Sequence, residues 1–265
     1  MWLNKNHNNK IQQEYKIDSK FLDVKGVLGN LEVYKSSYFG EIAKIGDTLL
    51  LKNKIAMQSE FLAHIGACSH KEPKRILIAG SFNLEIAYEL LKHSDLKVDF
   101  LQFDLKILES LISFFPHYKE VFANERFTHI PQKNEEFLAQ NEGKENFYDV
   151  IYALGDKESA FASLLSENGI LIAKLPNLIL ELDSAKEKIQ NIGDFLIKMP
   201  FYVPLSLDLE DCYLLISKRF HPTADIALQR ADMLGDLEYY HANLHLSAFV
   251  LPKNIKTKLL EVSKN

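Results

Sequence analysis

Acidic residues that follow apolar runs are the clearest candidates for chemistry in this sequence. Asp156 lies just beyond the apolar run 148–154, and Asp104 lies just beyond the run 98–103. A carboxylate at the end of a buried strand can accept a proton from a substrate or a hydrogen bond from a ribose hydroxyl. Asp156 is therefore a candidate base, although an acidic cluster such as residues 156–158 more often begins a helix. Asp104 could equally cap the helix that follows it.

The histidines and cysteines give weaker signals. His241 and His245 have the spacing of two ligands on one helix face, but no acidic residue lies between them and no cysteine is near. We therefore expect a structural or substrate-closing role for them and no metal. Cys68 lies between His64 and His70 and could be imagined as a nucleophile. A cysteine at the end of a helix is far more often a small buried side chain, so we expect that role.

Composition places the chain among ordinary globular proteins. Hydrophobic residues make up 47% and charged residues 25% of the 265 residues, which suits one large domain, with or without a small addition. The formal net charge of −5 and the lack of a basic block argue against a nucleic-acid partner. No apolar run approaches the roughly 18 residues that span a bilayer, and the two cysteines are far apart. We expect a cytoplasmic protein with no membrane partner.

The first part of the chain has the pattern of short paired strands. Hydrophobic and polar residues alternate over 30–34 and 40–45, and a third short run covers 48–52. Gly29-Asn30 and Gly46-Asp47 are turn signals. This pattern predicts a small N-terminal antiparallel β-domain over residues 1–56. A helix over 58–67 follows it.

From residue 74 the pattern changes to strands that alternate with helices. Such alternation predicts a Rossmann-like α/β domain over 57–265, with a mostly parallel sheet, helices on both faces and an antiparallel hairpin at one edge. The predicted strands are 75–79, 98–103, 127–130, 148–154, 169–174, 201–203 and 212–217, and the predicted helices are 84–92, 107–115, 159–165 and 185–196.

The turn after the first of these strands contains a single glycine. Gly80 stands alone in residues 79–85, so the sequence lacks the glycine-rich cradle of a dinucleotide site. A nucleoside ligand has no pyrophosphate to bind and stays compatible with this turn. In an open sheet of this kind the ligand lies at the carboxyl ends of the strands, where the strand order reverses.

The C-terminal segment 239–252 contains a Tyr-Tyr pair, His245, an Ala-Phe pair and Leu-Pro. In this order it resembles the end of the polyamine aminopropyltransferases (spermidine synthases). Glu60 with His64, the run 75–80 and the run 148–151 also resemble motifs of that family, in the same order along the chain. The resemblance implies a methyltransferase-type sheet and a homodimer or homotetramer. It also implies that an aminopropyl group passes from decarboxylated S-adenosylmethionine, a co-substrate, to putrescine, with no further cofactor.

The resemblance also implies which residues form the site. Compared with the family, the acid of the glycine loop is replaced by Asn83, and Leu154 stands in place of the first aspartate of the catalytic loop, the family's presumed base. Asp156, two residues further on, is then the substitute base. The implied donor-binding residues are Gly80, Gln102, Asp104 and Gln132, and the implied substrate contacts are Glu60, His64, Asn83, Tyr239 and His245.

Two other classes of function remain open at this point. The neutral residues Asn83, Gln102 and Leu154 are compatible with a protein that binds nucleosides or polyamines and has little or no activity. A different nucleoside-using enzyme, such as a methyltransferase, has the same type of sheet. In either case Tyr239 and Tyr240 could simply be core aromatic residues.

Overall fold

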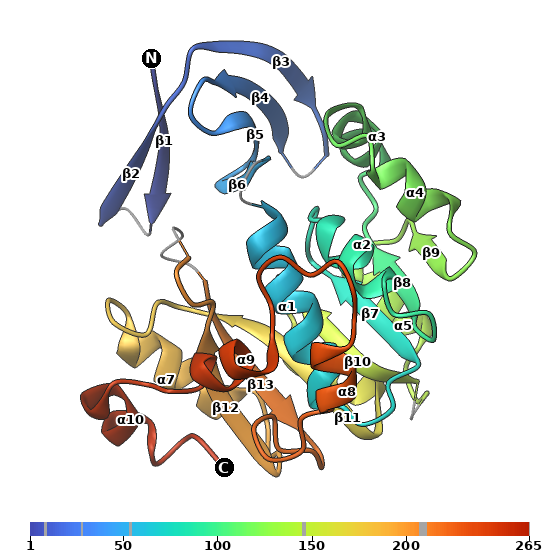
Figure 1. Ribbon diagram of the computed structural model, residues 1–265, viewed down its shortest axis with the longest axis vertical. Helices are drawn as coiled ribbons and strands as arrows, with labels where there is room; N and C mark the ends of the chain where they lie inside the picture. Colours follow the sequence, from blue (N-terminus) through green and yellow to red (C-terminus); the bar gives the residue numbers. More distant parts are fainter. Residues whose placement is uncertain (8–9, 28, 53–54, 145–146, 207–210, 265) are drawn as a thin grey trace.

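The computed structural model describes residues 1–7, 10–27, 29–52, 55–144, 147–206 and 211–264. Its centre is a seven-stranded sheet with the order β12-β13-β11-β10-β7-β8-β9 (Figure 1). Neighbouring strands from β9 to β11 pair in parallel, and β13 is antiparallel to both β11 and β12. The predicted sheet with its antiparallel edge hairpin is confirmed. The strands are β7 Arg75–Ala79, β8 Lys97–Leu101, β9 Phe127–Ile130, β10 Tyr148–Ala153, β11 Leu165–Leu175, β12 Ile197–Tyr202 and β13 Cys212–Ser217.

Helices cover both faces of this sheet because its strands are apolar on both sides. On β7, Ile76 and Ile78 join one hydrophobic cluster, and Leu77 and Ala79 join the other. The helices of the first cluster are α1 Ile55–Ser69, α2 Glu85–Leu91, α3 Leu105–Phe114, α4 Tyr118–Ala123, α8 Leu228–Asp232 and α9 Ala242–Ala248. Those of the second cluster are α5 Asn134–Gln140, α6 Glu158–Phe161, α7 Leu182–Asn191 and α10 Lys253–Leu259.

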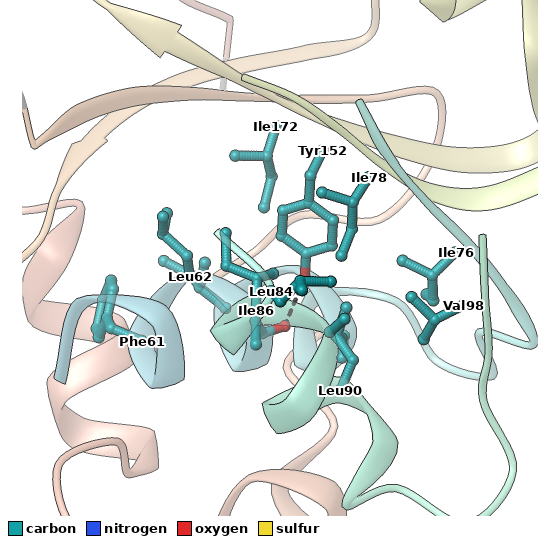
Figure 2. Close-up of a cluster of buried hydrophobic side chains, with 14 of the residues drawn as sticks. Phe61, Leu62, Ile76, Ile78, Leu84, Ile86, Leu90, Val98, Tyr152 and Ile172 are labelled. Carbon is teal, nitrogen blue, oxygen red and sulfur yellow. Dashed lines mark hydrogen bonds between the residues drawn. The ribbon is translucent and has the colours of Figure 1, made fainter. Parts of the chain in front are cut away.

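Helix α1 lies against the sheet at a glycine. A Cβ atom on Gly66 would lie 2.3 Å from the hydroxyl of Tyr152, so a larger residue would push α1 away from β10. The Tyr152 hydroxyl donates a hydrogen bond of 2.5 Å to the carbonyl of Ala63. Figure 2 shows the Tyr152 ring pointing from the sheet into the cluster that includes Leu62 of α1 and Leu90 of α2. This packing fixes α1, whose first turns face the ligand edge described below.

The residues before α1 form two antiparallel sheets, at the top of Figure 1. Strands β1 Trp2–His7 and β2 Ile11–Lys16 make a hairpin, and β3 Ser19–Lys25, β4 Asn30–Ser36, β5 Gly40–Ile45 and β6 Thr48–Leu51 pair in sequence order. Leu3, Tyr15 and Tyr34 share a small cluster that joins the two sheets, whereas Leu31 and Val33 belong to the main core. The N-terminal antiparallel unit is confirmed, and the domain boundary at residue 56 stays a prediction.

The structure differs from the sequence-based expectation at several ends of elements. The helix expected over 185–196 ends at Asn191, because Gly193 has a φ of 110° and leads into β12. Strand β11 begins at Leu165, earlier than expected. Across the described ranges, no helix is long and apolar enough to cross a membrane.

Candidate functional site

The strand order reverses between β7 and β10. The chain leaves β7 toward β8 and β9 on one side and returns to β10 on the other, so the loops after β7 and β10 meet at the edge where a ligand is expected. The backbone nitrogen of Leu154 donates a hydrogen bond of 2.9 Å to the carbonyl of Ala79. Gly80 has a φ of 74°, and a Cβ atom on it would lie 2.5 Å from the nitrogen of Gly155. The two loops therefore touch through their backbones.

Asn83 ties the loop after β7 to helix α1. Its amide nitrogen donates to the hydroxyl of Ser59 at 2.8 Å, and its amide oxygen accepts from the backbone nitrogen of Glu85 at 3.0 Å. An aspartate at this position would have no donor for Ser59. Because protein groups bind both ends of the Asn83 amide, a contact with substrate stays a prediction for this residue.

Gln102 and Asp104 organise the end of β8. The amide nitrogen of Gln102 donates to the carbonyl of Ser81 at 3.3 Å, and its oxygen accepts from the backbone nitrogen of Asp104 at 3.1 Å. The Asp104 carboxylate accepts from the nitrogen of Ile107 at 3.3 Å, which is the helix-capping role, and from the nitrogen of Val27 at 2.6 Å. The structure thus shows the capping role for Asp104. Asp104 is only 2% exposed, and a ribose hydroxyl would have to bind the carboxylate together with these two backbone nitrogens.

Gln132 follows β9 at the outer end of the same edge. It is half-buried, and its amide nitrogen donates to Gln140 at 3.1 Å. His129, the third residue of β9, contacts the carbonyl of Gln102 at 2.6 Å, so the ends of β8 and β9 lie together. This location agrees with a nucleoside contact at Gln132, which stays a prediction.

The loop after β10 contains three charged residues, Asp156, Lys157 and Glu158. Lys157 forms an ion pair of 2.7 Å with Glu135, and Glu158 forms an ion pair with Lys188. Asp156 directly precedes Lys157 and is exposed, and it makes no hydrogen bond or ion pair with any part of the chain that the structure describes. The two charged residues that follow Asp156 are thus held in ion pairs, while its own carboxylate is available to a ligand.

A cavity of about 440 Å³ lies beside Asp156. Residues of the β1–β2 hairpin form one wall, and the loop after β11, which includes Asn177, forms another. Lys10, Lys174 and Lys188 also line this cavity. Glu181 lines the cavity as well, and Lys188 is paired with Glu158. A substrate in this cavity can reach the Asp156 carboxylate.

Glu60 holds the C-terminal strap, which we define as residues 237–241. Its carboxylate accepts three backbone hydrogen bonds, from Glu238 at 3.1 Å, Tyr239 at 2.8 Å and Tyr240 at 2.6 Å. Glu60 is 3% exposed, so we assign it to the strap and not to direct substrate contact. Tyr239 is half-buried, and its hydroxyl donates to the carbonyl of Pro204 in the loop between β12 and β13.

Two predicted substrate contacts lie in the core instead. His64 and His245 each have 0% exposure. The ring of His64 contacts His93 at 2.9 Å and Glu89 at 3.2 Å, and the ring of His245 contacts the Tyr240 hydroxyl at 2.6 Å. Contact with a substrate would require the core to open, so we reassign both as structural residues. Among the residues that the structure places, no cluster of three histidine, cysteine or acidic side chains could hold a metal.

We expect two buried histidines, His93 and His245, to make the protein less stable in acid. Burial lowers the pKa of His245 to about 4 and that of His93 to about 3. In the unfolded chain these groups have a pKa of about 6.5. Their contribution to the free energy of unfolding is therefore complete above that pH and decreases as the pH falls toward 4. His245 alone should account for roughly 2 kcal/mol between pH 8 and pH 5, measured by urea unfolding.

A matched variant identifies the source of this effect. His241 is exposed, so His241→Gln should leave the pH dependence unchanged, whereas His245→Gln should reduce its slope. A free energy of unfolding that stays constant from pH 8 to pH 5 would contradict the assignment.

Three residues that shape this edge were not predicted from the sequence. Gln58 donates through its side chain to the carboxylate of Asp211, and the hydroxyl of Tyr213 lies 3.1 Å from the same carboxylate. The hydroxyl of Ser59 accepts the hydrogen bond from Asn83 in the loop after β7. A signal was present for Gln58 and Ser59, because both directly precede Glu60. No pattern in the sequence marks Asp211, which is buried directly before β13.

The strand order and the loops at its reversal point define the class of the protein. It is a Rossmann-like α/β protein with its ligand edge over β7, β8 and β10. A spermine/spermidine synthase domain matches residues 56–223. The chain is 39% identical over 270 residues to a polyamine aminopropyltransferase of Helicobacter acinonychis, covering 100% of both chains. It is 38% identical over 261 residues to one from Helicobacter pylori strain G27, covering 97% of each. The chain therefore belongs to the spermine/spermidine synthase family.

Solved structures show the same fold. Spermidine synthase from Thermotoga maritima matches with a TM-score of 0.85 and 19% identity, over 98% of this chain and 95% of that one. A spermidine synthase in complex with the transition-state analogue AdoDATO matches with a TM-score of 0.86 over the same shares. At this level of identity the likeness concerns the fold.

Proposed function

We propose that the protein transfers the aminopropyl group of decarboxylated S-adenosylmethionine to putrescine, giving spermidine and methylthioadenosine. Relatives named polyamine aminopropyltransferase align with the whole chain, which supports the reaction type. The observation that carries the proposal for this chain is Asp156, whose carboxylate has no partner within the described ranges and lines a cavity at the edge where the strand order reverses. We propose that Asp156 is the general base.

The reaction needs a base but no acid. The amine nitrogen attacks the carbon next to the sulfonium, so that the C–N bond forms while the C–S bond breaks and its electron pair returns to sulfur. The thioether leaves uncharged and needs no proton. An alkyl amine resembles lysine, with a pKa of about 10.4, and is mostly protonated near pH 7. Asp156 would take the proton that the attacking nitrogen must lose, and no cofactor or metal takes part in the proposed step.

The donor nucleoside would bind over the ends of β7, β8 and β9. Gly80 has no side chain to block the approach of a ligand to the turn after β7. Gln102 can bind a ribose hydroxyl through its amide, and the backbone of Asp104 holds that amide in place. Gln132 lies where it could contact the base. These roles follow the family resemblance and the positions of the residues.

A second function has a specific observation in its favour. Asn83 and Gln102 are neutral and already bound by protein groups, and Leu154 cannot accept a proton. A protein that binds nucleosides or polyamines without turnover would fit these features.

A product assay separates the two functions. Purified protein is incubated with decarboxylated S-adenosylmethionine and putrescine, and methylthioadenosine is read by mass spectrometry. Product at rates well above buffer supports the transferase. Binding of both ligands in a calorimeter without product supports the alternative and overturns the proposal.

We also propose a homodimer or homotetramer in the cytoplasm. Two large aromatic side chains of the N-terminal unit are exposed, Trp2 of β1 by 56% and Tyr38 in the turn between β4 and β5 by 78%. Exposed aromatic residues are typical of interfaces. Cys68 and Cys212 are buried free thiols, which suits a reducing compartment. Light scattering would give the mass in solution, and a monomer would overturn the proposed assembly.

A further inference from the structure

The residue after Asp156 has a backbone conformation that is rare for a residue with a side chain. Lys157 has a φ of 72° and a ψ of 30°, which is the left-handed helical region. A Cβ atom makes this conformation unfavourable, whereas a glycine would adopt it without that cost. Such conformations persist only where the surroundings hold them, and they are frequent at active sites. The contacts around Lys157 therefore have to hold the chain in this turn.

The chain is held on both sides of Asp156. On one side, Gly155 packs against the backbone of Gly80. On the other side, the carbonyl of Lys157 accepts a hydrogen bond of 3.1 Å from the backbone nitrogen of Phe161, whose side chain is buried in the second hydrophobic cluster. Asp156 is thus joined to two fixed points, and the turn at Lys157 sets the direction in which the chain leaves it.

The side chain of Lys157 makes a contact that a glycine could not make. Its ammonium group forms an ion pair of 2.7 Å with Glu135, in the first turn of α5. The hydrogen bond from Lys157 lowers the pKa of the Glu135 carboxyl, so the pair is charged at neutral pH. Helix α5 follows β9 and Lys157 follows β10, and β7 and β8 lie between these two strands. The ion pair therefore joins the two sides of the edge at which the donor is proposed to bind.

Stability alone does not account for this arrangement. The side chains of Lys157 and Glu135 are 43% and 61% exposed, and ion pairs between exposed side chains contribute little to the stability of a fold. The left-handed conformation costs a residue with a Cβ atom at least as much as such a pair contributes. A glycine at this position should therefore give a fold of about the same stability. What the lysine adds is a fixed position for the loop.

We propose that Lys157 is a positioning residue for Asp156, and that its ion pair with Glu135 fixes the turn that presents the Asp156 carboxylate to the cavity. The inference rests on the proposed aminopropyl transfer, in which Asp156 is the base. A general base acts efficiently only when it is held within hydrogen-bond reach of the proton that it takes. Lys157 is not among the described residues that line the cavity, so it acts through its neighbour.

The main test is Lys157→Gly. Glycine allows the left-handed turn but removes the ion pair, so the loop becomes less ordered while the fold remains. The kcat should fall roughly tenfold, which is less than for Asp156→Asn because the base is still present, and both KM values should stay within about twofold. The free energy of unfolding should stay close to that of the wild type. A purely structural residue would show the opposite result, with lower stability and an unchanged kcat of the folded protein.

A second measurement shows whether Lys157 acts through Asp156. In the Asp156→Asn background, Lys157→Gly should cause no further loss of kcat, because the group that it positions is absent. A further tenfold loss in that background, on the order of that in the wild type, would overturn the positioning role. Lys157→Arg retains the charge and can pair with the same carboxylate, so its kcat should stay within about twofold of the wild type.

Glu135→Gln and Glu261→Gln form a matched pair of variants. Glu261 is also exposed, and it forms an ion pair of the same length, 2.7 Å, with Lys186 of α7. Glu135→Gln should lower kcat several-fold and make backbone hydrogen exchange faster in residues 155–161. Glu261→Gln should change neither quantity. Equal effects of the two variants would overturn the role of the ion pair.

The results separate this inference from the proposed function. If the wild type forms methylthioadenosine and the Lys157→Gly and Glu135→Gln variants keep its kcat, this inference alone is wrong. If the folded wild type forms no methylthioadenosine, the proposed function fails, and the positioning role toward a base fails with it.

Discussion

Replacement of Asp156 by asparagine should lower kcat by about 10²- to 10⁴-fold, the usual cost of losing one oriented base. Asparagine has nearly the same shape but cannot take the proton of the attacking amine. Because Asp156 has no partner among the residues that the structure describes, the substitution breaks no protein contact there. The free energy of unfolding should change by less than about 0.5 kcal/mol. Steady-state assays of methylthioadenosine and urea unfolding measure the two quantities.

Two further variants make this result specific. Asp47→Asn changes another exposed aspartate, in the turn between β5 and β6, and should have no effect on kcat. Glu158→Gln tests the other acid of the loop, which is already paired with Lys188. If Glu158→Gln abolishes turnover and Asp156→Asn does not, the base has been assigned to the wrong residue.

Replacement of Gly80 by alanine should destabilise the protein by about 2–5 kcal/mol. The left-handed conformation at φ 74° costs a residue with a Cβ roughly 1–2 kcal/mol, and the Cβ would also lie 2.5 Å from the backbone of Gly155. Backbone atoms in a packed loop cannot move away cheaply, so overpacking adds about 1–3 kcal/mol. Urea unfolding gives the change, and calorimetry should show weaker donor binding.

Gly143→Ala isolates the conformational part of this cost. Gly143 has nearly the same φ, 76°, and no described atom lies within 4 Å of the position that a Cβ atom would take there. This variant should lose roughly 1–2 kcal/mol. Equal losses in the two variants would mean that the loops after β7 and β10 can separate freely.

The sheet could be predicted from sequence because its strands are continuous apolar runs separated by amphipathic helices. The short helices α4 and α5 could not, since six or seven residues carry too little periodicity to stand out. The end of α7 was missed for a different reason. The apolar residues Leu196 and Ile197 continue the helical pattern, and only the φ of Gly193 shows that the chain turns there.

The site was predictable in its location and less so in its residues. The sequence pattern places Glu60 and His64 on one helix face, but spacing alone does not tell whether that face meets a ligand or the protein interior. The structure turns His64 into the core, beside Glu89 and His93. The sequence left ribose binding and helix capping equally open for Asp104. Its contact with Val27, which is 77 residues away, could not be predicted from local sequence.

The C-terminal strap also affects the order in which the molecule is completed. Glu60 and Tyr240 are 180 residues apart in the chain, so their contact closes a very long loop. Because the entropy of loop closure is lost before such a contact stabilises the fold, we expect it to form late in folding. The parallel strands and α1 can assemble before the strap docks. During refolding, the circular-dichroism signal of the helices should therefore recover before the distance between Glu60 and the strap reaches its native value. A nascent chain could form the contacts between Glu60 and the strap only after residue 240 had been made.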